Sequence, residues 1–288
     1  MYKRQVFNSL GVIGLLIFMV SFTLVLLDTP VFSALRSGEI VQPAPVQDNG
    51  AKAWYWVLLI IGAVFSGASF LFCMNTVYSK TTNFFVQTGP LTIGTWAALC
   101  GVFAIFCSAV FYGAYGKKHG WSARRAGLYL NLEQLWKTIA LAVIVIVVSF
   151  GLVFAAHYFF QVDYRMYVVA FKTFGADKVL IALRYLPFFL LFYVMNSISA
   201  NCFNYNTIGG KNGNILIFAF FNALGAIFVV ASQYIYFYAT GYQLYGLTEG
   251  QRIGPIWLFP CMVLLFVTPI MSRIIYKRTR NPYIAGLI

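Results

Sequence analysis

The sequence predicts an all-α fold, a polytopic membrane helix bundle with about seven transmembrane helices. Hydrophobic residues make up 61% of the 288 residues and charged residues only 9%, whereas a soluble domain has about 25% charged residues. Several apolar runs reach the roughly 20 residues that cross a bilayer as a helix. Outer-membrane strands would instead give short alternating segments.

The chain from Val6 onward is interpreted as a single transmembrane domain, residues 6–288. Its predicted spans cover residues 6–27, 53–78, 91–115, 138–160, 181–204, 215–240 and 255–276. The apolar ending NPYIAGLI suggests a truncated eighth span. Residues 1–5, MYKRQ, include Tyr-Lys-Arg-Gln, which resembles the translated end of the transposase sequence used in preparing sequencing libraries. We favour a sequencing-adapter artefact over an ordinary basic N-terminus before a signal anchor.

The elements follow one another with recognisable boundaries. The first span lacks the small-residue cleavage site of a signal peptide, so we expect it to stay in the membrane. Residues 28–52 contain three prolines and form a polar connection with one apolar turn at 31–35. Tryptophans open the second span in the manner of interfacial anchors. Within it, Ala63 and Gly67 have the spacing of a close helix contact, which we attribute to the high frequency of small residues in this chain.

A basic segment, residues 116–137, separates the third and fourth spans. It carries five Lys or Arg residues against one acid, Glu133, with apolar residues between them. This pattern predicts an amphipathic segment at the cytoplasmic headgroups. The basic cluster that ends the seventh span predicts the same side.

The distribution of basic residues predicts the orientation. With seven spans, the loops at 28–52, 116–137 and 205–214 and the tail after Ile270 carry twelve Lys and Arg residues. The opposite side carries six once residues 1–5 are excluded. The positive-inside rule then puts the N-terminus outside and the tail inside the plasma membrane.

The fifth span carries the candidate site. It begins with Arg184 and ends in a series of amides. Polar groups at membrane depth need a partner, a backbone group or water, so this helix is expected inside the bundle. Either a polar cavity or interhelical hydrogen bonds would account for the amides, and Asn196 and Asn204 share a helical face that Asn201 does not. The candidate polar-cavity or anion-contact residues are Arg184, Asn196, Asn201, Asn204, Asn222, Gln233 and His157.

Two of these residues have a simpler interpretation. Arg184 either binds an anionic group within the bundle or extends to the outer headgroups from the start of its helix, and the second is favoured. His157 lies near the end of its span with no acid in any span to accompany it. It is interpreted as a hydrogen-bonded interfacial imidazole rather than a proton relay.

No catalytic, metal or cofactor site is predicted. The sequence contains none of the motifs G-x-S-x-G, H-E-x-x-H, G-x-x-x-x-G-K-[ST] or G-x-G-x-x-G. The five cysteines lack the paired spacing of metal sites or disulfide frameworks. Nucleic acid is not an expected partner despite the net charge of +13, because the basic residues lie in short clusters between apolar runs; membrane lipids are.

Four stretches of the chain resemble a known family. They are FNSLGVIGLLIFMVSFTLVLLDTPVF, RYLPFFLLFYVMNSISANCFNYNTIGGKNG, FNALGAIFVVASQYIYF and GPIWLFPCMVLLFVTPIMSRIIYKRTRNPYIAGLI. Together they resemble the C-terminal multi-spanning region of bacterial membrane-bound α/β-hydrolase-type proteins, in which a hydrolase-like domain precedes the membrane helices. The resemblance implies that the nucleophile, acid and histidine of such a domain would lie upstream of Val6.

Three functional hypotheses follow. The first is a non-catalytic membrane module that anchors or serves an extracytoplasmic esterase-like α/β-hydrolase domain, a partner in cis. The second is a permease or lipid transporter, with the amides and Arg184 lining its path. The third, a membrane-embedded acyltransferase, lacks a paired histidine and acid.

Overall fold

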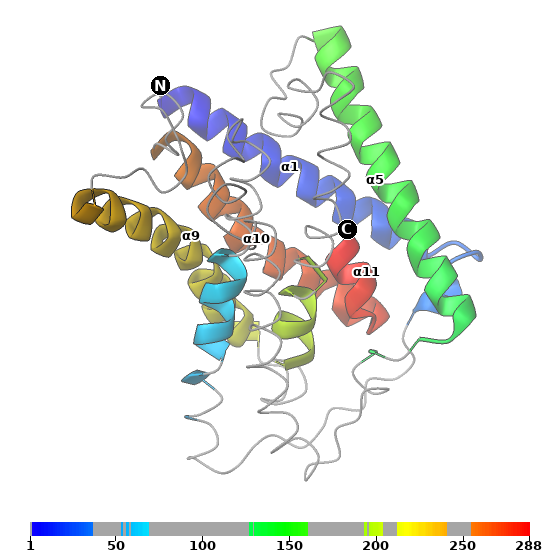
Figure 1. The fold of residues 1–288 in the computed structure, drawn as a ribbon. Helices are drawn as coiled ribbons and strands as arrows, with labels where there is room; N and C mark the ends of the chain where they lie inside the picture. The colour runs from blue at the N-terminus through cyan, green and yellow to red at the C-terminus, as the bar shows by residue number, and fades with distance from the viewer. Residues whose placement is uncertain are drawn as a thin grey trace.

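Helices form all the regular secondary structure in the part of the chain that the computed structural model describes (Figure 1). The described residues are 2–36, 53, 56–57, 59–68, 127–128, 130–160, 193–194, 196–203, 212–240 and 255–288. The all-α prediction is therefore confirmed for these residues. The predicted span 91–115 lies outside them, as do most of 181–204 and the end of 53–78.

Four long helices dominate the described fold. They are α1 (Tyr2–Leu27), α5 (Leu132–Phe160), α9 (Asn212–Thr240) and α10 (Pro255–Thr279). Three shorter elements are the 3₁₀ helix η1 (Ser33–Leu35), the π-helix η3 (Ile198–Phe203) and α11 (Pro282–Leu287), and residues 59–68 are also helical. Figure 1 shows α10 between α1 and α9, with α11 lying between α10 and α5.

The predicted boundaries hold at some helix ends and shift at others. α1 and α5 end at Leu27 and Phe160, as expected, and α10 begins at Pro255, where the fixed φ of proline suits a first helical position. α5 begins at Leu132 rather than at residue 138. The Asn131 side chain accepts a hydrogen bond from the Gln134 amide at 2.7 Å, and the Gln134 side chain accepts one from the Asn131 amide at 3.3 Å. This reciprocal cap starts the helix early, so residues 132–137 are its first turns and not a separate segment.

α5 is the one described helix that is long and apolar enough to cross a membrane, over Leu132–Val153. Shorter apolar helical stretches occur at Ile13–Leu27, Leu59–Ala68 and Ile215–Phe228. The outer face of α5 exposes branched side chains, including Ile139, Val143 and Val147, which are 51%, 52% and 64% exposed. α5 therefore presents an apolar face that the rest of the described fold does not cover.

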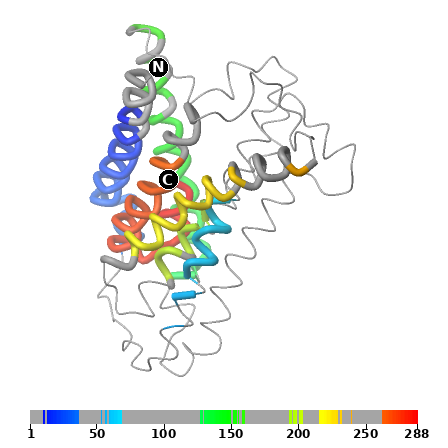
Figure 2. The backbone as a smooth tube through the Cα atoms, turned by 90° about the vertical axis from the view of Figure 1, so that its left-hand side faces the viewer, coloured from blue at the N-terminus to red at the C-terminus, as the bar shows by residue number. Residues whose placement is uncertain are grey.

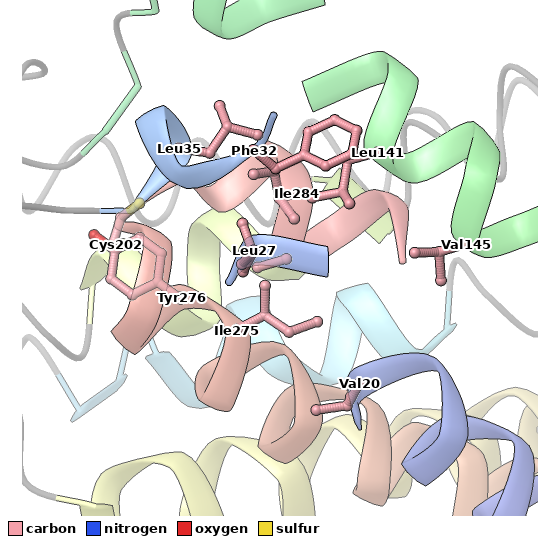
Figure 3. Close-up of a cluster of buried hydrophobic side chains, with 11 residues drawn as sticks. Val20, Leu27, Phe32, Leu35, Leu141, Val145, Cys202, Ile275, Tyr276 and Ile284 are labelled. Atoms are coloured by element: carbon pink, nitrogen blue, oxygen red, sulfur yellow. The ribbon is translucent and has the colours of Figure 1, made fainter. Parts of the chain in front are cut away.

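The main hydrophobic core lies where α1, α5, α10 and α11 converge (Figure 3). Leu27 from α1, Leu141 from α5 and Ile284 from α11 point toward one another around Ile275 and Tyr276 of α10. The apolar turn predicted at 31–35 contributes two of its residues, because Phe32 and Leu35 are buried against this core.

A second contact joins α9 to the helical segment 59–68 through glycines (Figure 2). A Cβ atom on Gly67 would overlap the main-chain carbonyl of Asn222, and one on Gly225 would lie 2.7 Å from the amide nitrogen of Ala68. Ala63 is fully buried beside them. Gly67 and Gly225 thus mark a helix crossing where only glycine lets the backbones approach. The spacing of Ala63 and Gly67 was attributed above to composition, and of these two residues Gly67 lies at the crossing.

Candidate functional site

Three of the predicted amides are buried inside the bundle. Asn196, Asn201 and Asn222 are 3%, 0% and 0% exposed. Asn196 Nδ2 donates to Asn222 Oδ1 at 3.3 Å, and Asn222 Nδ2 donates to the Leu265 carbonyl at 2.8 Å. A chain of hydrogen bonds thus runs from residue 196 through α9 to α10.

Asn201 forms the second half of this amide network, together with two serines. Its Nδ2 donates to Ser272 Oγ at 2.7 Å and to Ser197 Oγ at 3.2 Å. The Ser272 hydroxyl in turn donates to Ser197 Oγ at 3.2 Å. These contacts tie η3 and the turn before it to α10. We define the amide network as Asn196, Ser197, Asn201, Asn222 and Ser272.

The π-helix η3 explains why Asn201 faces inward. An α-helix would place Asn201 about 140° around the axis from Asn196, since each residue turns the helix by about 100°. A π-helix closes its hydrogen bonds between residues i and i+5, so positions five apart come closer to alignment. Asn204 lies outside the described residues, so the expectation that Asn196 and Asn204 share a helical face that Asn201 does not stays a prediction.

One oxygen of the network has no partner among the described residues. Asn201 Oδ1 is buried and accepts no hydrogen bond there, while the main-chain carbonyl of Asn201 accepts one from Arg273 Nη1 at 3.3 Å. Buried side-chain acceptors usually have a donor. Asn201 Oδ1 is accordingly a buried acceptor of the network that has no donor among the described residues.

Arg273 occupies a different environment from the one its sequence neighbourhood suggested. It belongs to the basic cluster predicted to face the cytoplasm, yet it is only 3% exposed. Lys277 and Arg278 are exposed, as a cytoplasmic cluster requires. The difference follows from helical geometry, because positions 272, 273, 275, 276 and 279 form the buried face of α10 and positions 274, 277 and 278 the open one.

Of the four other predicted site residues, two lie outside the described residues and two lie on described helices. Arg184 and Asn204 lie outside the described residues. His157 and Gln233 lie on α5 and α9, with nothing further described of their side chains. The sequence interpretation in turn missed Ser197, Ser272 and Arg273. Ser197 directly follows Asn196 and could have been included, whereas Ser272 and Arg273 had no local signal.

A second polar group, the cap cluster, joins the start of α11 to α5. Asn281 Oδ1 accepts from the amides of Tyr283 and Ile284 at 3.0 and 3.2 Å, and Asn281 Nδ2 donates to Thr138 Oγ1 at 3.0 Å. The Tyr283 hydroxyl donates to the Leu128 carbonyl at 2.9 Å.

An apolar cavity of about 300 Å³ adjoins the amide network. Its walls come from α1, α5, α10, α11 and residues 193–197, and its polar lining includes Ser149, Asn196, Ser197, Thr268 and Ser272. In the described part of the chain, no three His, Cys, Asp or Glu residues lie close enough to hold a metal ion. The arrangement can form hydrogen bonds and apolar contacts, and the described residues show no nucleophile paired with a base.

The chain matches no protein-family model, no curated protein and no solved structure.

Proposed function

We propose that the chain is a polytopic bacterial plasma-membrane module of about seven spans that catalyses no reaction itself and anchors or serves an extracytoplasmic α/β-hydrolase domain. The observation that carries the membrane part is α5. Its apolar stretch Leu132–Val153 is as long as a bilayer-spanning helix and leaves branched side chains uncovered on one face. Among lipid tails, exposure of such an apolar face carries no free-energy penalty.

The amide network supports a non-catalytic role. Three side-chain hydrogen bonds join its five members across different segments, and Asn222 also donates to the Leu265 carbonyl. Interhelical bonds of this kind contribute about 1 kcal/mol each in membrane bundles. The network therefore has the features of a fastening between helices. The hydrolase partner is proposed from the sequence resemblance and agrees with a charge distribution that puts the N-terminus outside.

A lipid or small-molecule transporter is the second candidate. The cavity beside the amide network favours it, since transporter sites lie at helix interfaces near the bilayer midplane. An Arg184→Ala and Asn201→Leu double variant that leaves the uptake of every candidate substrate unchanged would count against transport.

Topology mapping tests the membrane part. Fusions truncated within each loop, and one after residue 288, would carry either alkaline phosphatase, which is active outside, or green fluorescent protein, which fluoresces inside. Fusions in 28–52, 116–137, 205–214 and after residue 288 should fluoresce, and those in 79–90, 161–180 and 241–254 should show phosphatase activity. Fluorescence at every position would refute the multi-span arrangement.

Two further measurements test the functional part. The purified chain should hydrolyse no ester of a broad panel above the rate in buffer, and robust hydrolysis by residues 6–288 would contradict the non-catalytic assignment. Long-read sequencing of the gene without transposase-based preparation should reveal an in-frame domain with a G-x-S-x-G elbow upstream of Val6. A true start at Met1 with its own ribosome-binding site would remove the hydrolase proposal.

A further inference from the structure

The cavity beside the amide network has the size of a small ligand site. Its volume of about 300 Å³ is at the lower end of the roughly 300–1,000 Å³ found for small-molecule pockets. It can hold a short stretch of one hydrocarbon chain, and it is too small for a whole diacyl lipid. Leu16 and Met19 of α1, Leu264 and Met271 of α10 and Ile146 of α5 form apolar walls suited to such a chain.

One polar group in the cavity wall has an unsatisfied hydrogen-bonding capacity. Ser149, on α5, is 1% exposed, and its Oγ has no hydrogen-bond partner among the described residues. Leaving a buried hydroxyl unbonded carries a free-energy penalty. A bound group that donates to or accepts from Ser149 Oγ would remove this penalty, so the position favours a ligand with one polar group.

The wall also bears on the charge of the ligand. None of the described residues that line the cavity is Lys, Arg, His, Asp or Glu. An ionised group in this environment would be buried without a counter-charge, which is strongly unfavourable. The cavity therefore favours a neutral polar group, a hydroxyl or an ester carbonyl, over a carboxylate or phosphate.

We propose that this cavity binds part of a single neutral alkyl or acyl chain that carries a hydroxyl or ester carbonyl group, with Ser149 hydrogen-bonded to that group. The inference rests on the proposed membrane location, because the bilayer is the source from which such a chain would enter. It adds a ligand class to a module whose other described polar groups fasten helices.

Photolabelling of the full chain in nanodiscs tests the assignment. The probes are a medium-chain alcohol with a diazirine near its tail and the matching hydrocarbon without the hydroxyl. Both should label saturably, and peptide mapping should place the adducts on α1 and α10 near Leu16 and Met271. Unlabelled monoacylglycerol and unlabelled free alcohol are then compared as competitors of the labelling. Stronger suppression by monoacylglycerol indicates a membrane lipid as the ligand, and stronger suppression by the alcohol indicates a free alcohol.

Two variants separate the polar from the apolar contribution. Ser149→Ala should weaken alcohol binding by about three- to tenfold, the range of one net hydrogen bond, and leave hydrocarbon binding unchanged. Leu16→Trp should fill the cavity and reduce both labels at least tenfold. Its matched control is Ile17→Trp, at the neighbouring position that is 50% exposed and does not line the cavity, which should label like the unaltered chain.

The outcomes distinguish this inference from the proposed function. The ligand assignment alone would be overturned if Ser149→Ala weakened the labelling by alcohol and by hydrocarbon equally. It would also be overturned if Leu16→Trp left the labelling unchanged while the protein still melted cooperatively. A correct reporter topology together with unsaturable labelling would do the same. Saturable labelling in detergent by a chain that fails the topology test would instead leave the cavity assignment standing and refute the membrane module.

Discussion

The amide network and the cap cluster are both buried and polar, but they satisfy different groups. In the cap cluster, Asn281 hydrogen-bonds to main-chain amides that the start of α11 would otherwise leave unpaired, and it links α11 to Thr138 of α5. In the amide network, most bonds join one side chain to another, as between Asn196 and Asn222. The first completes helix ends, whereas the second fastens helices that are already complete.

This difference shows what a buried amide implies in an apolar chain. A series of asparagines in a hydrophobic run is compatible with a transport path or with helix fastening, because either provides the required partners. The partners distinguish the two. Asn222 reaches a side chain and a carbonyl of other segments, while Ser149 has no described partner and is one of the residues that line the cavity. The most strongly bonded polar groups are therefore the least suited to binding a ligand.

The largest effect is expected from Gly67→Leu, which tests whether the amide network depends on the glycine crossing between residues 59–68 and α9. Gly67→Leu would force side-chain atoms into the space held by the Asn222 main chain. Overpacking of this kind costs about 3 kcal/mol, and moving Asn222 would also break its bond to Asn196. SDS-driven equilibrium unfolding in mixed micelles measures the loss.

Gly14 provides the matched control for this substitution. It lies on α1 with nothing within 4 Å of an added Cβ. Gly14→Leu should be neutral or slightly stabilising, since glycine in a helix interior is less favourable than other residues by about 0.5–1 kcal/mol. Equal destabilisation by the two substitutions would contradict a specific crossing at Gly67.

The cap cluster should show the next largest effect. Asn281→Ala removes the acceptor for two main-chain amides of α11 and the donor to Thr138, and alanine can replace none of these contacts. Loss of a helix N-cap costs about 0.5–2 kcal/mol, and we expect the upper end because the site is buried. Asn281→Ser should lose less stability than Asn281→Ala, because serine keeps a neutral cap acceptor. A serine variant as unstable as the alanine variant would contradict capping as the cause.

The sequence allowed the all-α class and several helix ends to be predicted, because apolar run length and caps are local properties. The expected positions of Leu27, Phe160 and Pro255 agree with the structure. The partner of Asn201 could not be predicted in the same way, since Ser272 lies 71 residues further along the chain. The burial of Arg273 was equally hidden, because a basic residue beside Lys277 and Arg278 has the pattern of a cytoplasmic end.

The smallest expected effect decides whether the amide network fastens helices at all. Asn222→Leu leaves the Asn196 donor and the Leu265 carbonyl without their partners, and Asn196→Leu leaves Asn222 Oδ1 without its donor. Each should destabilise by about 1 kcal/mol, and the double variant by less than the sum, since the second substitution removes a group that the first had stranded. A double-mutant cycle in mixed micelles should give a coupling of about 0.6 kcal/mol, the average for hydrogen bonds between transmembrane helices. A coupling of zero would mean that the two amides act independently. Because Asn196 also lines the cavity, that result would favour ligand contact over helix fastening as the role of Asn196.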